Sequence, residues 1–596
     1  MKFPYGIADF GVVVQEDYFY VDRTDKIPLI EAAGRQLLFL RPRRFGKSLL
    51  LSMLEHYYDL AKADEFEQTF GQLSIGQEPT PLHSQYFVLK WDFSMVSPQG
   101  DIDCIRRSLF DHINGEITAF VQKYSHYWQR PVDINKDNAI ASLRSVLTSV
   151  EQTGYKLYLL IDEYDNFANE VVMSSRDVGK KRYQALLEGE GILKTVFKTL
   201  KAAAAGRGLE RVFITGVSPI VVSDLTSGYN VVENIFLNSE FNDLCGFTEA
   251  ELEQTLKDLV QSTANELPPV QETLALMRSF YNGYCFMETE QATQERIYNP
   301  TLVLYFLKKF LHDGAYPSHL LDDNLAMDRG KLSYIARLPE GESAIQAAIE
   351  GEPPLTLESL VQRFGIEDVL YAKKDRAFMV GLFYYFGILT LQGRDAFGDL
   401  CFGVPNQVIF KLYVQQLKLS LLPDWDDEGS KQPVRAFYSR GDLQLVVDLI
   451  EQHILPVFDN RDYAQVNELT IKTAFLLLLY NDRLYQMESE TRAGKGYVDL
   501  ALIVRPDARR YPVLDLVLEF KYVSLKQLGM TGQEVRQLKE EACWDLAEVR
   551  KSFEQAKEQL GRYCDALHQK YGEGLQLRCY AVLALGLERV LWREVK

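Results

Sequence analysis

The sequence predicts an α/β protein with three parts: a parallel-sheet unit, a helical, winged-helix-like middle region and a second α/β unit. Short apolar runs alternate with helical stretches through residues 1–310. Residues 311–422 are richer in helix, and residues 434–596 return to strands and helices. These ranges are the three expected domains, and the Pro-, Asp- and Gly-rich stretch at 423–430 is the expected linker.

Composition and length set the class of protein. The 596 residues are too many for one core, so roughly two to four domains are expected. Without a membrane-spanning run or a signal-peptide pattern, we expect a cytoplasmic protein with no membrane partner. Seven cysteines scattered singly predict reduced thiols instead of a zinc ribbon or a disulfide framework. The net charge of -18 disfavours indiscriminate nucleic-acid binding but leaves room for a local basic groove.

The first part is expected to contain four strands and four helices. The strands are expected at 37–40, 86–91, 157–161 and 211–215, and the helices near 48–62, 101–123, 137–152 and 184–204. This alternation implies right-handed crossovers and a parallel sheet that is covered on both faces.

A phosphate-binding loop is expected between the first strand and the helix after it. The usual pattern is G-x4-G-K-[ST], whose backbone N–H groups and lysine surround the phosphates of a nucleotide. Here Arg41 stands at the first glycine, while Gly46, Lys47 and Ser48 keep their places. Gly46 allows close approach of the backbone, Lys47 supplies charge, and Ser48 can reach a phosphate-bound Mg2+. The position between a strand and a helix favours nucleotide binding over a chance basic loop.

Three arginines crowd this loop, and one aromatic residue lies among them. They are Arg41, Arg43 and Arg44, and Phe45, next in the chain, is expected to belong to the nucleotide-binding loop with them. Arginine forks match phosphate oxygens well, so we expect one of them to bind the nucleotide in cis. The alternative is that the arginines pair with surface acids of this chain or of a neighbouring one.

The second half of a nucleotide site is expected where the strand at 157–161 ends in Asp162 and Glu163. A carboxylate at the carboxyl end of a strand can hold Mg2+ through water, as we expect of Asp162. The adjacent Glu163 can orient and deprotonate the attacking water. Thr215 ends the next strand, at the position that senses the γ-phosphate in ATPases with an extra strand between the two Walker motifs. A plain strand cap is the alternative role for Thr215.

Short motifs run in order through the first 300 residues. They are P-Y-G-I-A-D-F at 4–10, Y-V-D-R-T at 20–24, R-P-R-R-F-G-K-S at 41–48, K-W-D-F-S at 90–94, I-D-E-Y-D at 161–165, F-I-T-G-V at 213–217, F-Y-N-G-Y at 280–284 and Y-N-P at 298–300. Together they resemble the AAA-ATPase-like family of bacterial proteins. The resemblance implies a P-loop fold of the AAA+/ASCE type, in which a loop without the first glycine is the norm. Cys285 departs from the pattern where arginine is expected, which puts an arginine sensor at that position in doubt.

The middle region ends in a helix–strand–turn–strand pattern. Residues 378–391 read as a buried helix that runs into a strand, and a Gly/Asp turn leads to a second strand near 400–404. This order is typical of a winged-helix module. Such a module can cover a nucleotide as a lid or read DNA, and we expect the lid.

Two apolar runs near the C-terminus present an aspartate and an E-x-K triplet. Asp499 lies on the first expected strand, 496–504, and Glu519 and Lys521 lie on the second. Because side chains alternate along a strand, Glu519 and Lys521 face one side and Phe520 the other. Two carboxylates and a lysine at one place make a Mg2+ site with a cation beside the attacking water or the scissile phosphate. The alternative for E-x-K is a solvated strand edge.

This segment resembles the PD-(D/E)XK nuclease superfamily domain that commonly follows such an ATPase. The resemblance implies that Glu468 opens the first core helix and is a further metal ligand. It also implies that Gln559, on the helix after the triplet, faces the site as a catalytic residue, and that 580–585 is the closing strand. Some members of the superfamily retain the triplet without known cleavage.

These features predict an ATP-dependent nuclease, whose ATP binding and hydrolysis control a metal-dependent site that cleaves nucleic acid. The expected cofactors are ATP and Mg2+, with Mn2+ as a substitute at the nuclease site. The expected partner is nucleic acid, DNA before RNA, and a homo-oligomer would allow a neighbouring subunit to supply an arginine. The alternative is a nucleotide-driven switch whose nuclease-like domain binds nucleic acid or protein without cleaving. Intact Glu163 argues against a third interpretation, in which ATP stays bound without hydrolysis.

Overall fold

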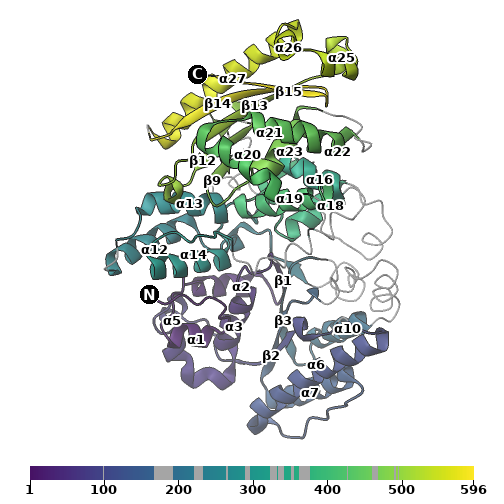
Figure 1. The fold of residues 1–596 in the computed structure, drawn as a ribbon. Helices are drawn as coiled ribbons and strands as arrows, with labels where there is room; N and C mark the ends of the chain where they lie inside the picture. The colour runs from purple at the N-terminus through teal and green to yellow at the C-terminus, as the bar shows by residue number, and fades with distance from the viewer. Residues whose placement is uncertain are drawn as a thin grey trace.

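The computed structural model has an N-terminal parallel sheet, a helical middle and a C-terminal mixed sheet, which follow one another along the molecule (Figure 1). The predicted α/β fold class is thus confirmed. The structure describes residues 1–595 apart from 98, 167–191, 220–231, 264–265, 289–294, 322–331, 333–340, 351–354, 361–375, 424, 426, 460–466, 489–491, 494–495, 498 and 573. Among the described helices, none combines the length and the apolar composition needed to cross a bilayer.

The N-terminal sheet has parallel strands in the order β2-β3-β4-β1-β5. They are β1 (Gln36–Leu40), β2 (Tyr86–Asp92), β3 (Lys156–Asp162), β4 (Leu209–Gly216) and β5 (Glu233–Asn234). All but β5 match the predicted strands closely. After its first residue β3 is buried throughout, as expected of a parallel strand covered on both faces. Because β4 pairs with both β1 and β3, the carboxyl ends of these three strands meet at one edge of the sheet.

Helices follow these strands as the sequence predicts. They are α3 (Lys47–Tyr58), α6 (Ile102–Lys123), α7 (Ala139–Thr153) and α10 (Ile192–Ala204). Local caps fix two of the starts, because the side chains of Asp101 and Asn138 accept backbone hydrogen bonds from the first turns of α6 and α7. The predicted helix at 184–204 is described only from Ile192 onward.

A group of three helices forms a second apolar core beside the sheet. They are α12 (Glu249–Ser262), α13 (Val270–Tyr281) and α14 (Pro300–Asp313), with Leu256, Met277 and Phe306 among the buried side chains between them. A capping box between Thr248 and Glu251 starts α12, and Asn299 caps α14 ahead of Pro300.

The middle region contains the predicted helix–strand–turn–strand order, with a third strand added. Its elements are α16 (Gly341–Glu350), β6 (Leu355–Leu357), α18 (Arg376–Tyr385), β7 (Thr390–Arg394), β8 (Leu400–Gly403) and α19 (Gln407–Leu421). The strands form an antiparallel sheet in the order β6-β8-β7. α19 packs against both α13 and the C-terminal helix α23 (Glu468–Leu479), so it connects the two ends of the molecule.

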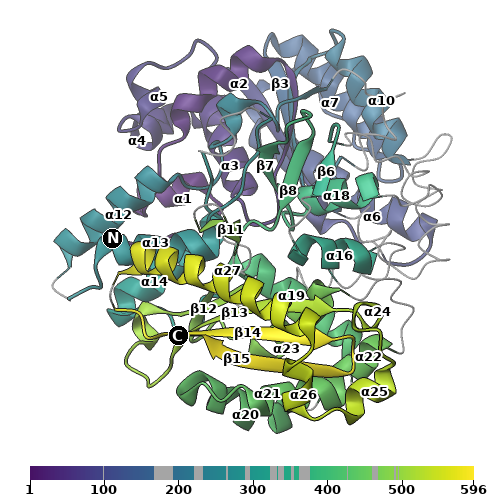
Figure 2. The same cartoon turned by 90° about the horizontal axis from the view of Figure 1, so that it is seen from above.

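The C-terminal sheet is mixed and has the order β15-β14-β13-β12-β9. Its strands are β9 (Tyr485–Glu488), β12 (Leu500–Val504), β13 (Asp515–Val523), β14 (Leu577–Leu585) and β15 (Arg589–Val595). Side chains alternate along β13: Phe520 packs on Phe475 of α23, whereas Val517 and Val523 join the core under α27 (Ala547–Tyr571). Helices therefore cover both faces of this sheet, and Figure 2 shows α27 lying across it.

Three local expectations differ from the structure. The expected linker at 423–430 is helical from Asp427, because α20 (Asp427–Arg440) begins there. The expected strand at 496–504 is broken: Gly496–Tyr497 forms the short strand β11, and Asp499 lies in a bend before β12. A disulfide joins Cys564 to Cys579, where seven separate thiols are expected, because packing of α27 on β14 brings the two together. Their Cα atoms are 7.7 Å apart, wider than the roughly 4.4–6.8 Å usual for such a bond.

Candidate functional site

The loop between β1 and α3 has the backbone of an anion-binding turn. Gly46 has a φ of +88° and is the residue just before the first turn of α3. Because Gly46 has no side chain, it does not cap the N–H groups at the start of this helix. The free N–H groups at the start of such a helix favour an anion. Arg44 also has a positive φ, +64°, and its carbonyl accepts a 2.8 Å hydrogen bond from the Thr301 hydroxyl. The N-terminus of α14 thus holds the loop in its left-handed turn.

Lys47 is folded back onto the loop that it follows. Its Nζ donates to the carbonyls of Arg41 and Pro42, both at 3.0 Å, and the side chain is buried. Burial lowers the pKa of Lys47, and the nearby carboxylates of Asp162 and Glu163 act in the opposite direction. The ammonium group therefore occupies the centre of the loop, where phosphate oxygens can replace the two carbonyls as acceptors.

Asp162 is shared between two hydroxyl groups from different elements. Ser48 Oγ donates to Asp162 Oδ2 and Thr215 Oγ1 donates to Asp162 Oδ1, each over 2.6 Å. These residues lie at the start of α3, the end of β4 and the end of β3. A serine hydroxyl and an aspartate at this edge are the oxygen ligands that Mg2+ takes in phosphate-binding loops. Thr215 contacts Asp162, and its role as a γ-phosphate sensor stays a prediction.

Glu163 follows directly and has unusual backbone geometry. Its φ is +48°, a region that residues with a side chain rarely adopt and that costs free energy unless the surroundings hold it. Burial raises the pKa of Glu163, and Lys47 acts against that rise. The carboxylate lines the same pocket as Lys47 and Ser48. A half-buried carboxylate with a raised pKa is suited to accept a proton from water.

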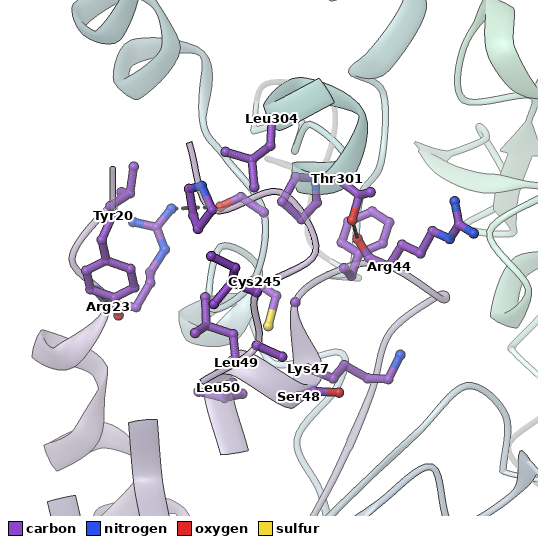
Figure 3. Close-up of a pocket in the computed structure, with 18 of the residues that line it drawn as sticks. Tyr20, Arg23, Arg44, Lys47, Ser48, Leu49, Leu50, Cys245, Thr301 and Leu304 are labelled. Atoms are coloured by element: carbon purple, nitrogen blue, oxygen red, sulfur yellow. Dashed lines mark hydrogen bonds between the residues drawn. The ribbon is translucent and has the colours of Figure 1, made fainter. Parts of the chain in front are cut away.

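A pocket of about 300 Å³ runs from these charged groups to an apolar end. Arg44, Lys47, Ser48 and Glu163 line the charged end. The apolar end is formed largely by side chains from outside the sheet, among them Tyr5, Ile7, Phe19, Tyr20, Phe247 and Leu304. Figure 3 shows Lys47 and Ser48 at the start of α3, with Tyr20 and Arg23 on one side and Leu304 above. The pocket thus combines the charged groups of the loop with apolar side chains, and Arg23 also lines it, beside Tyr20.

The segments 4–8, 19–21 and 244–247 line this pocket, although the sequence predicts no binding role for them. For the segment 4–8, the motif at 4–10 is the feature of the sequence that could have indicated a functional role. Arg23 ties the wall to α12, because its guanidinium donates to both carboxylate oxygens of Glu251 and to the Asp243 carbonyl. A contact between partners so far apart in the sequence has no local signature.

The loop arginines have separate surroundings. The guanidinium of Arg41 is buried and donates to three backbone carbonyls, and its contact with phosphate stays a prediction. Arg43 donates to Asn166 Oδ1 at 2.5 Å, and Arg44 lines the pocket. Phe45 is buried, meets the rings of Tyr284 and Phe286 edge-on and also lines the pocket. Nucleotide contacts by Arg43 and Arg44 stay predictions.

A second group of charges lies on the C-terminal sheet. Lys521 Nζ donates to Glu519 Oε1 at 2.9 Å and to Glu468 Oε1 at 3.2 Å. The carboxylate of Asp499 accepts a 2.8 Å hydrogen bond from the backbone N–H of Phe520. The structure therefore brings together Asp499, Glu519, Lys521 and Glu468, as the sequence predicts. Gln559 lies half-buried on α27, and its role stays a prediction.

Glu519 is the most buried member of this group, with 1% of its surface exposed. Burial raises the pKa of Glu519, and the charge of nearby Asp499 raises it further, against the opposing effect of Lys521. Its Oε2 atom is buried and has no hydrogen-bond partner among the residues that the structure describes. An unpartnered buried oxygen beside a second carboxylate is what a divalent cation would satisfy.

The number of carboxylates limits which cation fits. Within the described ranges, no three His, Cys, Asp or Glu side chains are placed so that they alone could hold a metal ion. Mg2+ is commonly held by one or two carboxylates, with water and substrate phosphate as the remaining ligands. Asp499 and Glu519 fit that donor set, and Lys521 contacts both Glu519 and Glu468. Glu468 as a further metal ligand stays a prediction.

Two family models match this chain. The first, described as Predicted AAA-ATPase, matches residues 4–226. The second, described as PD-(D/E)XK nuclease superfamily, matches residues 466–594. Lys47, Asp162 and Thr215 lie within the first match, and Asp499 and Glu519 lie within the second.

A curated relative, the uncharacterized protein in the vnfD 5' region of Azotobacter chroococcum mcd 1, is 26% identical over 344 residues. The match covers 54% of this chain and 55% of the relative, so the chain spans about half the relative's length. Two solved structures from Aeropyrum pernix align at 10% identity. The ORC2 protein with ADPNP and ADP covers 67% of this chain and 92% of its own, with a TM-score of 0.31. The ORC1 protein in complex with DNA covers 69% and 91%, with a TM-score of 0.24.

Proposed function

We propose that this chain, which carries an AAA-ATPase-like domain at 4–226 and a PD-(D/E)XK nuclease superfamily domain at 466–594, uses ATP hydrolysis to control metal-dependent cleavage of nucleic acid. The observation that carries the proposal is the position of Asp162. Its two carboxylate oxygens are held by Ser48 and Thr215, next to Lys47 and Glu163. This arrangement joins a phosphate anchor, a cation ligand and a proton acceptor in one place.

The pocket residues have distinct parts in the proposed ATPase reaction. Lys47 exchanges its two carbonyl acceptors for phosphate oxygens, and the N–H groups at the start of α3 bind the same anion. Glu163 orients the attacking water and takes its proton. The apolar end, around Tyr5, Ile7 and Phe247, is suited to a purine base, which makes ATP the proposed nucleotide.

The charged residues of the C-terminal site also have distinct roles in the proposed cleavage reaction. Asp499 and Glu519 would hold a divalent cation, and Ser48 with Asp162 would hold the one at the nucleotide. Bound Mg2+, or Mn2+ at the nuclease site, would polarise phosphate oxygens and offset the charge that develops on them. Lys521 would place the attacking water and stabilise the negative charge of the phosphate being cleaved. We propose DNA as the first substrate to test.

One observation favours a second candidate, a nucleotide-driven switch with a non-cleaving C-terminal domain. Lys521 contacts Glu519 and Glu468 directly, and Glu519 is almost completely buried. With these contacts in place, Lys521 competes with a metal ion for Glu519 and Glu468. A domain in which the lysine keeps both carboxylates would bind nucleic acid or protein without cutting it.

Plasmid nicking by the full chain separates the two candidates. Supercoiled DNA and single-stranded DNA or RNA are incubated with Mg2+ or Mn2+, with and without ATP, alongside Lys47→Ala and Lys521→Ala. If the proposed function holds, cleavage requires the metal ion and its rate changes when ATP is added. Lys521→Ala should abolish cleavage, and Lys47→Ala should abolish the effect of ATP on cleavage. Hydrolysis of ATP without cleavage of any substrate, and without an effect of Lys521→Ala on nucleic-acid binding, would leave only the switch.

A further inference from the structure

Arg41 occupies a buried socket at the position of the missing glycine. Its Nη1 donates to the carbonyls of Leu40 at 2.8 Å and Phe236 at 2.9 Å, and its Nη2 donates to the carbonyl of Phe241 at 2.6 Å. Only 1% of the residue is exposed. Burial lowers the pKa of Arg41 to about 10, and among the described residues no carboxylate forms an ion pair with it. Among the described residues, backbone carbonyls are the hydrogen-bond partners of this guanidinium, and its buried Nε has none.

Two aromatic rings complete the socket. The guanidinium carbon lies 4.4 Å from the ring centre of Phe39 and 4.0 Å from that of Phe286. Phe39 belongs to β1, and Phe286 belongs to the segment after α13. Cation–π contacts of a desolvated arginine are each worth roughly 0.5–2 kcal/mol, and lysine does not match the planar fork. The socket therefore fits a flat, multiply donating cation.

The backbone of Arg41 connects this socket to the proposed catalytic groups. Its carbonyl accepts a 3.0 Å hydrogen bond from Lys47 Nζ. Its N–H donates to the Gly216 carbonyl at 3.2 Å, one residue after Thr215 on β4. The side chain therefore anchors a residue whose main chain contacts both Lys47 and the end of β4, the strand beside Asp162.

The backbone conformation does not call for glycine at this position. The described non-glycine residues with positive φ are Asp17, Arg44, Ser84 and Glu163, so Arg41 has an ordinary conformation. Glycine here would keep the turn but lose five contacts: three carbonyl hydrogen bonds and two rings. The backbone conformation therefore does not explain why arginine stands at this position, whereas the contacts of its side chain do.

We propose that Arg41 is a positioning residue, which sets the phosphate loop through a guanidinium socket and does not itself touch the nucleotide. The socket fixes the loop to the segments after β5 and after α13, so that Lys47 and the start of α3 are aligned before a nucleotide arrives. This proposal rests on the proposed ATP site, and it assigns the unusual arginine of the loop to preorganisation.

Chemical rescue tests the socket directly. Binding of a fluorescent ATP analogue to the full chain is measured for the wild type, Arg41→Ala, Arg41→Gly, Arg41→Lys and Lys47→Ala, with and without millimolar guanidinium chloride. We expect Arg41→Ala and Arg41→Gly to weaken binding by about tenfold or more, and guanidinium to restore most of it. Sodium chloride at equal concentration should restore nothing, and neither wild type nor Lys47→Ala should respond to guanidinium.

The outcomes distinguish three situations. If the wild type and Lys47→Ala bind the analogue equally poorly, the proposed ATP site fails. If the wild type binds and Lys47→Ala does not, but Arg41→Gly binds as well as the wild type, the socket proposal fails alone. Weak binding by Arg41→Ala that guanidinium cannot restore in a folded protein also overturns it.

A second variant keeps the test decisive if the arginine substitutions do not fold. Phe286→Leu removes one ring of the socket and leaves Arg41 in place, with its three carbonyl partners. We expect this variant to weaken analogue binding by about threefold or more, consistent with the loss of a cation–π contact. Val260→Leu, at an exposed apolar position on α12, is the control and should bind as the wild type does. Unchanged affinity in folded Phe286→Leu would count against the proposal.

Discussion

Gly387 lies against Pro42 of the phosphate loop. A Cβ atom added to Gly387 would be 2.7 Å from Pro42 Cγ and 2.8 Å from Pro42 Cβ. Gly387 follows α18, and the Ile388 carbonyl beside it accepts a 3.0 Å hydrogen bond from Tyr413 on α19. At the other side of α19, Lys411 forms a 2.7 Å ion pair with Asp482 of the C-terminal domain. The middle region is thus in direct contact with the phosphate loop and with the C-terminal domain.

Gly387→Ala should uncouple the two proposed activities. The added methyl group meets Pro42 and must adopt a φ of +72°, so the loop or the middle region has to move. We expect the stimulation of cleavage by ATP to fall by about tenfold, within the usual range of coupling between sites, while cleavage without ATP remains. Nicking rates at saturating and zero ATP measure this ratio.

The matched control is Gly398→Ala in the β7–β8 turn. Gly398 also has a positive φ, +91°, but an added Cβ has nothing within 4 Å. The control has the same kind of backbone cost without the contact to the loop, so its ATP response should match that of the wild type. Equal responses in the two variants would show that the contact with Pro42 does not transmit the nucleotide state.

Glu163→Gln should separate ATP binding from hydrolysis. The amide keeps the size of the side chain but cannot take a proton from water, so kcat should fall about 100-fold or more. The affinity for ATP should change by less than about threefold, because Lys47 and the start of α3 supply the phosphate contacts. Equilibrium binding and phosphate release are measured on the same preparation.

Lys47→Ala is the contrasting variant for this measurement. It removes the ammonium that now bonds the carbonyls of Arg41 and Pro42, so both binding and hydrolysis should be lost. If Glu163→Gln hydrolyses ATP as fast as the wild type, another group must activate water. The raised pKa of Glu163, which burial causes, would then have no catalytic role.

Part of the nucleotide site could be predicted because its residues are set by local pattern. An apolar strand, a turn with Gly46 and a helix with Lys47 and Ser48 follow one another in the chain, and their order defines the site. Asp162 could be predicted for the same reason, as the first carboxylate after a buried strand. In both cases the functional residue lies at the boundary of an element whose periodicity is visible in the sequence.

The surroundings of Arg41 could not be predicted, because its partners are remote in the sequence. The carbonyls of Phe236 and Phe241 lie 195 and 200 positions further along the chain. The same holds for the pocket wall at 4–8 and for the pairing of Cys564 with Cys579, which depends on how α27 packs on the sheet. The sequence predicts Asp499 as a site residue, but it does not predict the bend in which Asp499 lies. The apolar run around it has the pattern of a continuous strand.

Lys521→Met should separate metal binding from cleavage in the C-terminal domain. Without its ammonium, Glu519 and Glu468 lose the cation that now bonds both. We therefore expect Mn2+ to bind at least as tightly as in the wild type, while cleavage falls about 100-fold or more. Titration calorimetry with Mn2+ and plasmid nicking measure the two effects.

Two further variants serve as controls for this experiment. Glu519→Gln should abolish Mn2+ binding, because it removes the buried carboxylate whose Oε2 lacks a partner. Lys526→Met, an exposed lysine on α24 (Leu525–Leu528) of the same domain, should leave both metal binding and cleavage unchanged. Loss of Mn2+ binding in Lys521→Met would mean that the lysine organises the carboxylates instead of competing for them.

Protonation of Asp22 in acid should lower the stability of the N-terminal region. Its Oδ1 accepts from the Thr24 N–H at 2.8 Å and the Thr24 hydroxyl at 2.6 Å, and its Oδ2 accepts from the Ser74 N–H at 2.7 Å. Burial opposes ionisation of Asp22, but the hydrogen bonds from Thr24 and Ser74 outweigh it, so its pKa lies below the ordinary value. Hydrogen bonds to a charged group are worth roughly 1.5–3 kcal/mol, and partial exposure of Asp22 reduces this.

The sign of the pH dependence follows from that lowered pKa. The ionised carboxylate stabilises the folded state above the unfolded-state pKa of about 3.9, and this contribution is lost as pH falls through the lower folded-state pKa. Asp22→Asn should therefore lower the thermal midpoint at neutral pH and differ less from the wild type below about pH 4. Asp25→Asn, an exposed neighbour with the same charge change, should follow the wild type. A gap between Asp22→Asn and wild type that stays constant down to about pH 3 would mean that packing, not the charge on Asp22, stabilises this segment.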